Sequence, residues 1–326
     1  MSNFKGKRVL ITGATGLIGS HLAKKLLDEE AVVIAMGRSI SRLESTFDRK
    51  KYGEKLILCE NDISSALPES IGKTDFIFHA ASPISGAEIK AHPVNTINAN
   101  LNGCVNCLEH IRKQGFGRLV VFSSATVYGN VYQKDTSVSE ENTAYADALH
   151  TANTPYSESK RMIEVLTRSY CTQYNTDAVI VRIGYVYGHT ANMPETAFYE
   201  FVKKAVLGQN IVMNGSGMGR RDNIHVYDVV SGLETAALKG EKGEMYNISS
   251  NGDLGNFRAI DEMAQIIADS AGHLFGDNRV QAVIKPFEGE RKPGIMLNNS
   301  KLKQLGWNVS ISLEDGIADT VKKYFG

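Results

Sequence analysis

A glycine-rich turn near the amino terminus constrains the fold of this chain more than any other feature. A short apolar segment, residues 9–12, leads into Gly13, Gly16 and Gly19, and an amphipathic stretch, Leu17–Asp28, follows. In a strand–turn–helix unit, the first glycine permits a tight turn, the second lets a pyrophosphate approach the backbone, and the third allows close helix packing. The sequence therefore predicts a dinucleotide-binding site rather than a simple turn with a helix cap.

The first half of the chain alternates short β-branched runs with longer amphipathic ones. This alternation is typical of parallel strands joined by helical crossovers, so the predicted fold class is α/β with a doubly wound parallel sheet. The expected strands are Arg8–Thr12, Val32–Met36, Lys55–Cys59, Phe76–His79, Leu119–Ser123 and Ala178–Ile183, and the expected helices lie near Leu17–Asp28, Val94–Lys113 and Tyr156–Tyr174.

The pattern changes to mixed helices and short strands after Gly188. We expect residues 1–185 to form the dinucleotide-binding domain, with 222–249 returning to it, and residues 186–221 and 250–326 to form a smaller mixed α/β domain that binds substrate. A polar segment, Gln133–Thr154, is expected to be a long loop that shapes the substrate pocket.

Composition indicates a small-molecule partner. The 326 residues include 36 Lys and Arg and 36 Asp and Glu, so no net field favours nucleic acid or an anionic membrane. No apolar run approaches the ~18 residues that span a bilayer, and the amino terminus does not resemble a signal peptide. We therefore expect a cytoplasmic protein with no membrane or nucleic-acid partner.

The four cysteines are too few and too scattered for a disulfide framework. Cys104 and Cys107 form a C-x-x-C pair, which can be a redox motif or half of a zinc site. No second pair or histidine cluster completes four ligands, so a packed helix is the favoured interpretation and no metal is expected.

Tyr156 and Lys160 are candidates for acid–base chemistry because residues four apart lie on one face of a helix. A lysine cation about 4 Å from a phenol is worth about 4 kcal/mol at an effective dielectric of ~20, which is roughly three pKa units. The prediction is a phenol that exchanges protons near neutral pH. The alternative is an amphipathic helix with a solvated lysine.

The residues after the second expected strand bear on the type of dinucleotide. A carboxylate that binds the ribose 2′-hydroxyl commonly ends this strand, but the sequence reads Gly37, Arg38 and Ser39. Arg38, helped by Ser39 or Arg42, suits a 2′-phosphate and favours NADP over NAD. The alternative is a solvated arginine beside a site that accepts NAD.

These motifs, with others in the same order, resemble the extended short-chain dehydrogenase/reductase family, specifically its nucleotide-sugar epimerases, dehydratases and reductases. The resemblance covers nearly the whole chain and implies a Rossmann sheet with a smaller substrate domain. It rests further on Asp62-Ile63, His79 to Ser82, Asn100 with Gly103, Ser123 to Gly129, Arg182, Val186 to Gly188, Arg221 to Val226, Glu290-Arg291 and Leu305 to Trp307.

The resemblance implies roles for individual residues. Tyr156 resembles the general acid/base, Lys160 the residue that binds the nicotinamide ribose and lowers the tyrosine pKa, and Ser124 the hydroxyl that orients the sugar. The cofactor contacts implied are Gly13, Thr15, Gly16, Leu17, Ile18, Gly19, Arg38, Ser39, Asp62, Ile63, Ala80, Ala81, Ser82, Asn100, Ser123, Tyr156, Lys160, Tyr185 and Val186. The substrate contacts implied are Ser124, Tyr185, Arg221 and Arg291, with the two arginines gripping a nucleoside diphosphate.

Departures from family patterns bear on the reaction. Dehydratases of this group carry an acidic pair where this chain has Ala125 and Thr126, and the segment from Ser123 to Gly129 resembles UDP-galactose 4-epimerases instead. Those epimerases keep the second-strand acid that is missing here, Tyr185 stands where an asparagine is usual, and His189 replaces a common proline.

The leading hypothesis is a nucleotide-sugar epimerase that acts through a 4-keto-sugar with NAD(P). The alternative is an NADPH-dependent 4-keto-sugar reductase, and a non-catalytic dinucleotide sensor is a third possibility. The resemblance also implies a homodimer that pairs through the helices near Val94–Lys113 and Tyr156–Tyr174.

Overall fold

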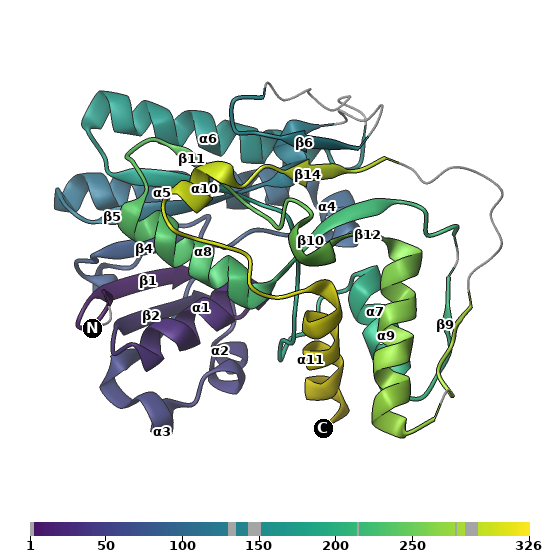
Figure 1. Ribbon diagram of the computed structural model, residues 1–326. Coiled ribbons are helices and arrows are strands. Elements are labelled where there is room, and N and C mark those ends of the chain that lie inside the picture. Colours follow the sequence, from purple (N-terminus) through teal and green to yellow (C-terminus); the bar gives the residue numbers. More distant parts are fainter. Residues whose placement is uncertain (1–2, 130–134, 143–150, 214, 278, 284–292) are drawn as a thin grey trace.

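The computed structural model of the chain describes residues 3–129, 135–142, 151–213, 215–277, 279–283 and 293–326. Its centre is a seven-stranded sheet in which all the strand pairs are parallel (Figure 1), with the order β11-β7-β5-β4-β1-β2-β3. The strands are β1 (Arg8–Thr12), β2 (Val32–Gly37), β3 (Leu56–Glu60), β4 (Phe76–His79), β5 (Arg118–Ser124), β7 (Ala178–Ile183) and β11 (Met245–Ile248). The doubly wound α/β fold is confirmed.

Strand order reverses direction beside β1, because β2 and β3 extend to one side and β4 and β5 to the other. In open α/β sheets, ligands bind in the crevice at the carboxyl ends of the strands where this reversal occurs. The glycine turn follows β1 directly, so it lies at this crevice.

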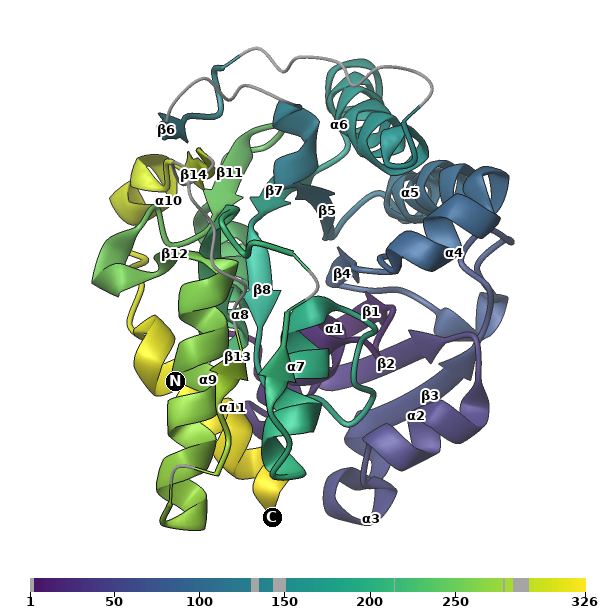
Figure 2. The same ribbon diagram turned by 90° about the vertical axis from the view of Figure 1, so that its right-hand side faces the viewer.

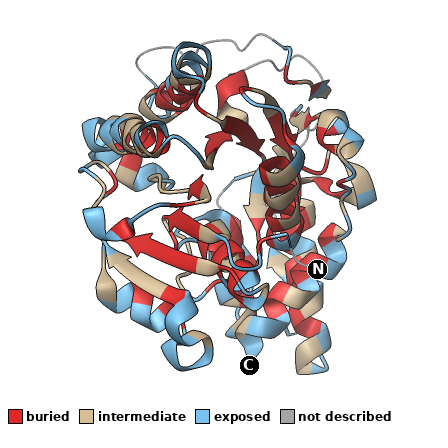
Figure 3. Ribbon diagram, turned by 90° about the vertical axis from the view of Figure 1, so that its left-hand side faces the viewer, coloured by how far each residue is buried: buried red, intermediate tan, exposed pale blue. Residues whose placement is uncertain are grey.

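Helices cover both faces of the sheet (Figure 2). On one face α1 (Leu17–Asp28), α2 (Ile40–Thr46) and α8 (Val226–Lys239) enclose one apolar core, and on the other α5 (Pro93–Gln114) and α6 (Thr154–Tyr174) enclose a second. Figure 3 shows that the central strands are largely buried between these layers. Burial on both faces explains why the strands read as nearly continuous apolar runs.

A smaller lobe lies beside the carboxyl ends of the strands. Its three-stranded sheet joins β8 (Tyr185–Tyr187), β10 (Arg220–His225) and β12 (Phe257–Ala259), and α7 (Ala197–Val206), α9 (Ile260–Phe275) and α11 (Leu313–Phe325) enclose its own apolar core. The remaining elements are the strand pairs β9 (Ile211–Val212) with β13 (Ala282–Val283) and β6 (Thr136–Val138) with β14 (Ile295–Leu297), and the short helices α3 (Arg49–Tyr52), α4 (Gly86–Ala91) and α10 (Ser300–Gln304).

The two lobes interleave along the sequence. Strand β11 joins the central sheet and α8 packs against it, whereas β10 pairs with β8 and β12 in the smaller sheet. The expected loop Gln133–Thr154 contains β6, which pairs with β14; residues 133–134 and 143–150 lie outside the described part of the chain.

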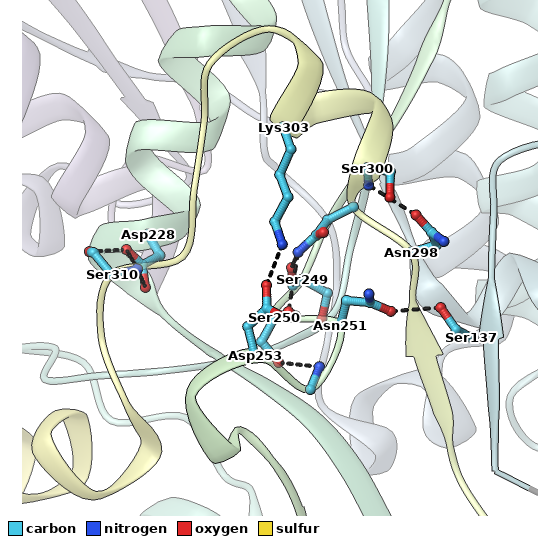
Figure 4. Close-up of polar contacts among 12 residues, drawn as sticks. Ser137, Asp228, Ser249, Ser250, Asn251, Asp253, Asn298, Ser300, Lys303 and Ser310 are labelled. Carbon is cyan, nitrogen blue, oxygen red and sulfur yellow. Dashed lines mark hydrogen bonds and ion pairs between the residues drawn. The ribbon is translucent and has the colours of Figure 1, made fainter.

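Polar contacts attach the carboxyl-terminal segment to the rest of the molecule (Figure 4). Lys303 Nζ donates to Asp253 at 2.5 Å, Ser137 Oγ donates to Asn251 at 2.6 Å, and Ser310 Oγ donates to Asp228 at 2.5 Å. The Lys303 and Ser310 contacts fix residues 303–310 against the turn that follows β11 and against α8, whereas the Ser137 contact joins β6 to the same turn.

Among the described residues, no helix has the length and apolar character needed to cross a bilayer. Cys104 and Cys107 are buried in the apolar core beneath α5, and all four cysteines are free. The C-x-x-C pair is therefore part of a packed helix, as expected.

Candidate active site

The glycine turn after β1 has little room for side chains. Gly13 has a φ of +66°, and a Cβ there would lie 2.8 Å from the Cα of Ala81 at the end of β4. A Cβ on Gly19 would overlap the carbonyl oxygen of Gly13. These two glycines therefore allow the turn to sit against both β4 and the first turn of α1.

Gly16 differs from the other two because its backbone conformation suits any residue, with φ of −76° at the N-cap of α1. A Cβ there would meet only the Gly13 carbonyl oxygen, at 3.3 Å, and has open space elsewhere. Since the first N–H groups of α1 have no partner within the helix, this space suits a pyrophosphate. The residues present therefore fit a dinucleotide.

Thr12 and His79 fix the floor of the crevice, and the sequence analysis assigned neither of them a role. The Ala81 N–H donates to Thr12 Oγ1 at 3.1 Å, which leaves the Thr12 proton to donate to His79 Nδ1 at 3.0 Å. Burial lowers the pKa of His79 to about 3, so its ring is neutral and accepts this hydrogen bond. The contact holds Ala80 and Ala81 beside the glycine turn.

At the outer end of the crevice, Arg38 lies among carboxylates. Its guanidinium is 3.8 Å from Glu88 Oε1 on α4. Hydrogen bonds from Ser64, helped by the charge of Arg38, lower the pKa of Asp62. Ile63 beside it is buried. Arg38, Asp62 and Ile63, all predicted cofactor contacts, therefore gather where β2 and β3 end.

Ser39 is the N-cap of α2, because its Oγ accepts from Arg42 N at 3.3 Å. Beside it, Glu60 Oε1 at the end of β3 accepts from Ile40 N at 2.9 Å. Glu60 was not among the predicted contacts, and its relation to β2 appears only once the strands are paired.

Ser124, Tyr156 and Lys160 come together at the inner end of the crevice. Ser124 ends β5, and Tyr156 and Lys160 lie in α6, which packs on β5. Lys160 Nζ donates to the Phe122 carbonyl at 2.7 Å and lies 5.7 Å from the centre of the Tyr156 ring. The hydroxyls that act on the phenol belong to Ser124 and Ser82.

Thr126 orients Ser124. Its Oγ1 donates to Ser124 Oγ at 3.1 Å and its N–H donates to the same atom at 3.2 Å. Ser124 Oγ accepts from both groups, so its own proton is directed elsewhere, toward the phenol or a substrate oxygen. From the sequence, Thr126 was notable only as a position that lacks an acidic side chain.

The prediction that Lys160 lowers the pKa of the Tyr156 phenol is wrong for the protein chain without cofactor and substrate. Burial raises the pKa of Tyr156, and the hydrogen bonds with Ser124 and Ser82 only partly oppose this. Burial also lowers the pKa of Lys160 to about 8. The sequence estimate assumed a partly solvated pair, but both groups lose hydration in the folded chain, and desolvation disfavours the charged form of each.

Asn100 links the segment after β4 to α6. Ser82 Oγ donates to Asn100 Oδ1 at 2.7 Å, and Asn100 Nδ2 donates to Ser159 Oγ at 2.8 Å. Ser159 Oγ in turn donates to the Tyr156 carbonyl at 2.9 Å. This chain of contacts fixes α6 relative to β4.

The Ser123 side chain is directed away from this cluster. Its Oγ donates to Glu164 Oε1 at 2.5 Å, and Arg182 donates to both Glu164 oxygens at 2.9 and 2.8 Å. A cavity of about 420 Å³ adjoins this buried ion pair, but its lining does not include Ser124, Tyr156 or Lys160. We therefore assign it no part in the candidate active site.

Tyr185 and Arg221, predicted substrate contacts, lie together on the neighbouring strands β8 and β10. The Arg221 guanidinium is 4.8 Å from the centre of the Tyr185 ring, which is 48% exposed. Val186, predicted to contact the cofactor, packs between the apolar cores of the two lobes. Arg291 lies outside the described residues.

The smaller lobe also reaches the glycine turn. Asn192 Nδ2 donates to the Thr15 carbonyl and to Thr46 Oγ1, both at 3.4 Å. Leu17 packs into the apolar core of the smaller lobe, and Ile18 against that of the larger one. No sequence pattern marks Asn192, because its partners lie far away along the chain.

A family model described as the NAD dependent epimerase/dehydratase family matches residues 9–249. The chain belongs to the NAD-dependent epimerase/dehydratase family. The match extends from β1 through β11 and so spans the glycine turn and α6, which carries Tyr156 and Lys160.

Individual members of the epimerase/dehydratase family align along the whole chain. The mouse dTDP-D-glucose 4,6-dehydratase is 26% identical over 331 residues, covering 98% of this chain and 88% of the mouse protein. The UDP-glucose 4-epimerase of Thermotoga maritima has a similar structure, with a TM-score of 0.80 at 23% identity over 97% of this chain and 98% of the other. The dTDP-glucose 4,6-dehydratase of Bacillus anthracis, solved in complex with NAD, has a TM-score of 0.77 at 24% identity, covering 97% of this chain and 96% of the other.

Proposed function

We propose that this chain is a nucleotide-sugar epimerase that uses a nicotinamide dinucleotide and acts through a 4-keto-sugar. Tyr156 is the general acid/base, Ser124 orients the reacting oxygen, and Lys160 supports the charge that develops on the phenol. Arg221 and Arg291 bind the substrate diphosphate. The proposal rests on the convergence of Ser124, Tyr156 and Lys160 at the crevice formed by the glycine turn.

The proton chemistry follows from these side chains. Tyr156 takes the proton of a sugar hydroxyl as the carbon loses hydride, and returns the proton when hydride comes back to the other face. The nicotinamide supplies the hydride acceptor and donor. Since the Lys160 pKa is about 8, the lysine is mostly protonated at neutral pH and favours the phenolate. Binding at the diphosphate, far from the reacting carbon, supplies orientation.

The environment of Ser124 supports epimerisation over dehydration. Loss of water across the sugar requires an additional acid and base, which the related dehydratases carry where this chain has Ala125 and Thr126. Thr126 makes a hydrogen bond to Ser124 and has no group that ionises near neutral pH. It therefore positions the Ser124 hydroxyl and does not protonate a leaving group.

A second candidate is a 4-keto-sugar reductase that consumes a reduced nicotinamide. The raised pKa of Tyr156 disfavours the phenolate, which is the form that takes a proton from a sugar hydroxyl, and leaves the phenol in the form that donates to a ketone. The Arg38 side chain led to the expectation of NADPH in this role. Both candidates require the same three catalytic side chains.

We also propose that the protein forms a homodimer through α5 and α6. Met162 and Val165 on α6 are 48% and 58% exposed, which is consistent with an apolar face that a second copy covers. Light scattering of the purified protein gives the mass of the particle.

Product analysis distinguishes the two reactions. The purified protein is incubated with UDP- and dTDP-hexoses, without added cofactor, and the sugars are separated by chromatography and assigned by NMR. An epimerase interconverts two sugars without net consumption of reduced cofactor. In a parallel incubation with a nucleotide keto-sugar and added NADH or NADPH, stoichiometric consumption of the reduced cofactor would instead identify a reductase. If neither reaction occurs and Tyr156→Phe leaves ligand binding unchanged, a dinucleotide sensor is the remaining interpretation.

A further inference from the structure

Strand β2 lacks the carboxylate that commonly binds the adenosine ribose, since it ends at Gly37. In the sheet, Gly37 is the register partner of Glu60 at the end of β3. Register partners on neighbouring strands carry their side chains on the same face of the sheet. Glu60 therefore presents a carboxylate on the face where a side chain at position 37 would lie.

A hydrogen bond fixes the position of the Glu60 carboxylate. Its Oε1 accepts from Ile40 N at 2.9 Å, which holds it over the first residue of α2, three residues after the end of β2. A Cβ at Gly37 would fit without a clash, in ordinary van der Waals contact with Leu43 at 3.5 Å and Thr15 Cγ2 at 3.6 Å. Thr15 belongs to the glycine turn, so this position faces the dinucleotide crevice.

The Arg38 side chain is directed toward different partners. Its guanidinium lies 3.8 Å from Glu88 on α4, and its charge helps the Ser64 hydrogen bonds to lower the pKa of Asp62. Helix α4 contacts α5, on the opposite face of the sheet from α2. The carboxylates of Glu88 and Asp62 therefore offset the positive charge of Arg38. That charge was the basis for expecting NADP.

The geometry points to Glu60 as the residue that selects the cofactor: its carboxylate binds the 2′-hydroxyl of the adenosine ribose and repels a 2′-phosphate. The chain therefore prefers NAD(H) to NADP(H), and Arg38 contacts the adenine side instead. This inference rests on the proposed dinucleotide site but not on the sugar reaction. It reverses the preference expected from Arg38 alone.

Cofactor binding tests the role of Glu60 without any sugar substrate. Dissociation constants for NADH and NADPH are measured by titration calorimetry on the full-length protein after removal of bound nucleotide. We expect the native protein to bind NADH at least ~10-fold more tightly than NADPH, since like charges in contact are strongly unfavourable. In Glu60→Gln the amide still accepts from Ile40 N, and the ratio should fall to within ~3-fold. Glu54→Gln, a change of an exposed glutamate outside the crevice, should retain the native ratio.

Relocating the carboxylate is a stronger test. In the double variant Gly37→Asp with Glu60→Gln, the carboxylate moves to β2, where a Cβ at position 37 would make ordinary van der Waals contacts with Leu43 and Thr15. This variant should regain at least ~10-fold preference for NADH. Arg38→Ala should weaken both cofactors to a similar extent and leave their ratio unchanged.

Three results would overturn the inference: tighter binding of NADPH by the native protein, an unchanged ratio in Glu60→Gln, or a selective loss of NADPH binding in Arg38→Ala. If the protein binds neither dinucleotide, the proposed function itself fails, and that outcome differs from a change in preference.

Discussion

At the scale of single residues, burial sets the chemistry of Tyr156. Burial raises the pKa of its phenol and so disfavours the phenolate further, which means that the proposed reaction requires groups that favour the phenolate when substrate is bound. We predict that Tyr156→Phe lowers turnover at least ~100-fold, the usual contribution of a positioned acid/base. The binding of NADH should change less than ~2-fold, because the phenol oxygen adds little to cofactor affinity.

Steady-state assays and calorimetry on Tyr156→Phe check these two expectations. Tyr174→Phe is the matched control, since Tyr174 ends the same helix and is 46% exposed. Equal turnover of the two variants would contradict the assigned role of Tyr156.

Gly16 and Gly19 of the turn should respond differently to alanine. Gly16→Ala has an acceptable backbone conformation, so the protein should fold normally, but the added methyl occupies space that the pyrophosphate needs. We expect NADH affinity to fall at least ~10-fold with little change in melting temperature. Gly19→Ala should lower the melting temperature instead, because its Cβ overlaps the Gly13 carbonyl.

Thermal melts and calorimetry separate these two effects, with Gly86→Ala as the control because nothing lies within 4 Å of a Cβ at Gly86. Normal NADH binding by Gly16→Ala would show that the phosphates lie elsewhere.

Ser124, Tyr156 and Lys160 come together in the structure, but their electrostatics differ from the prediction. Spacing made Tyr156 and Lys160 candidates, and the family resemblance added Ser124. The direction of the Tyr156 pKa shift depends on how much water the fold removes, which no local pattern reveals. Glu60 and Asn192 could not be recognised, since their positions depend on strand pairing and on contact between lobes.

At the scale of elements, the expected strands and helices of the first half agree with the structure within one or two residues at each end, and Leu17–Asp28 agrees in full. The local pattern suffices there, because each element buries a long apolar face. The short strand β6 was expected to be loop. Its partner, β14, lies more than 150 residues away, and three residues carry too little periodicity to identify a strand.

Asp228, near the start of α8, connects the two lobes. The buried carboxylate accepts from the N–H groups of Ser310 and Ile311 at 3.1–3.2 Å and from the Ser310 hydroxyl at 2.5 Å. In Asp228→Asn an amide N–H group faces these donors, so we expect a loss of about 2–3 kcal/mol in the free energy of unfolding.

Urea denaturation of Asp228→Asn measures this loss. Asp269→Asn, at an exposed position in α9, should cost less than ~0.5 kcal/mol. A similar small effect at Asp228 would show that the carboxyl-terminal segment is held by its other contacts, such as the pair formed by Lys303 and Asp253.

At the scale of the whole molecule, the buried cation of Lys160 reduces the free energy of unfolding. Lys160 is buried, and burial lowers its pKa from 10.5 to about 8, so the unfolded chain binds more protons than the folded chain between these values. Stability therefore rises with pH across this window. Below about pH 8 the full cost of burying the charge is present, and above about pH 10.5 it is absent.

Lys160→Met removes this dependence. The free energy of unfolding of the native protein, minus that of Lys160→Met, should increase by about 2 kcal/mol between about pH 7 and pH 9.5. The native protein and Lys160→Met both contain the buried thiols of Cys104 and Cys107. Burial raises the pKa of these thiols, which destabilises the fold at alkaline pH. Subtracting one free energy of unfolding from the other largely removes this shared effect.

Tyr156→Phe serves as the control for this measurement, because the raised pKa of Tyr156 keeps the phenol protonated throughout the same range. Its stability relative to the native protein should therefore not vary with pH. Denaturation curves at closely spaced pH values measure both differences. A flat difference for Lys160→Met would mean that Lys160 keeps its hydration in the folded state, and the phenol would then face a solvated cation instead of a buried one.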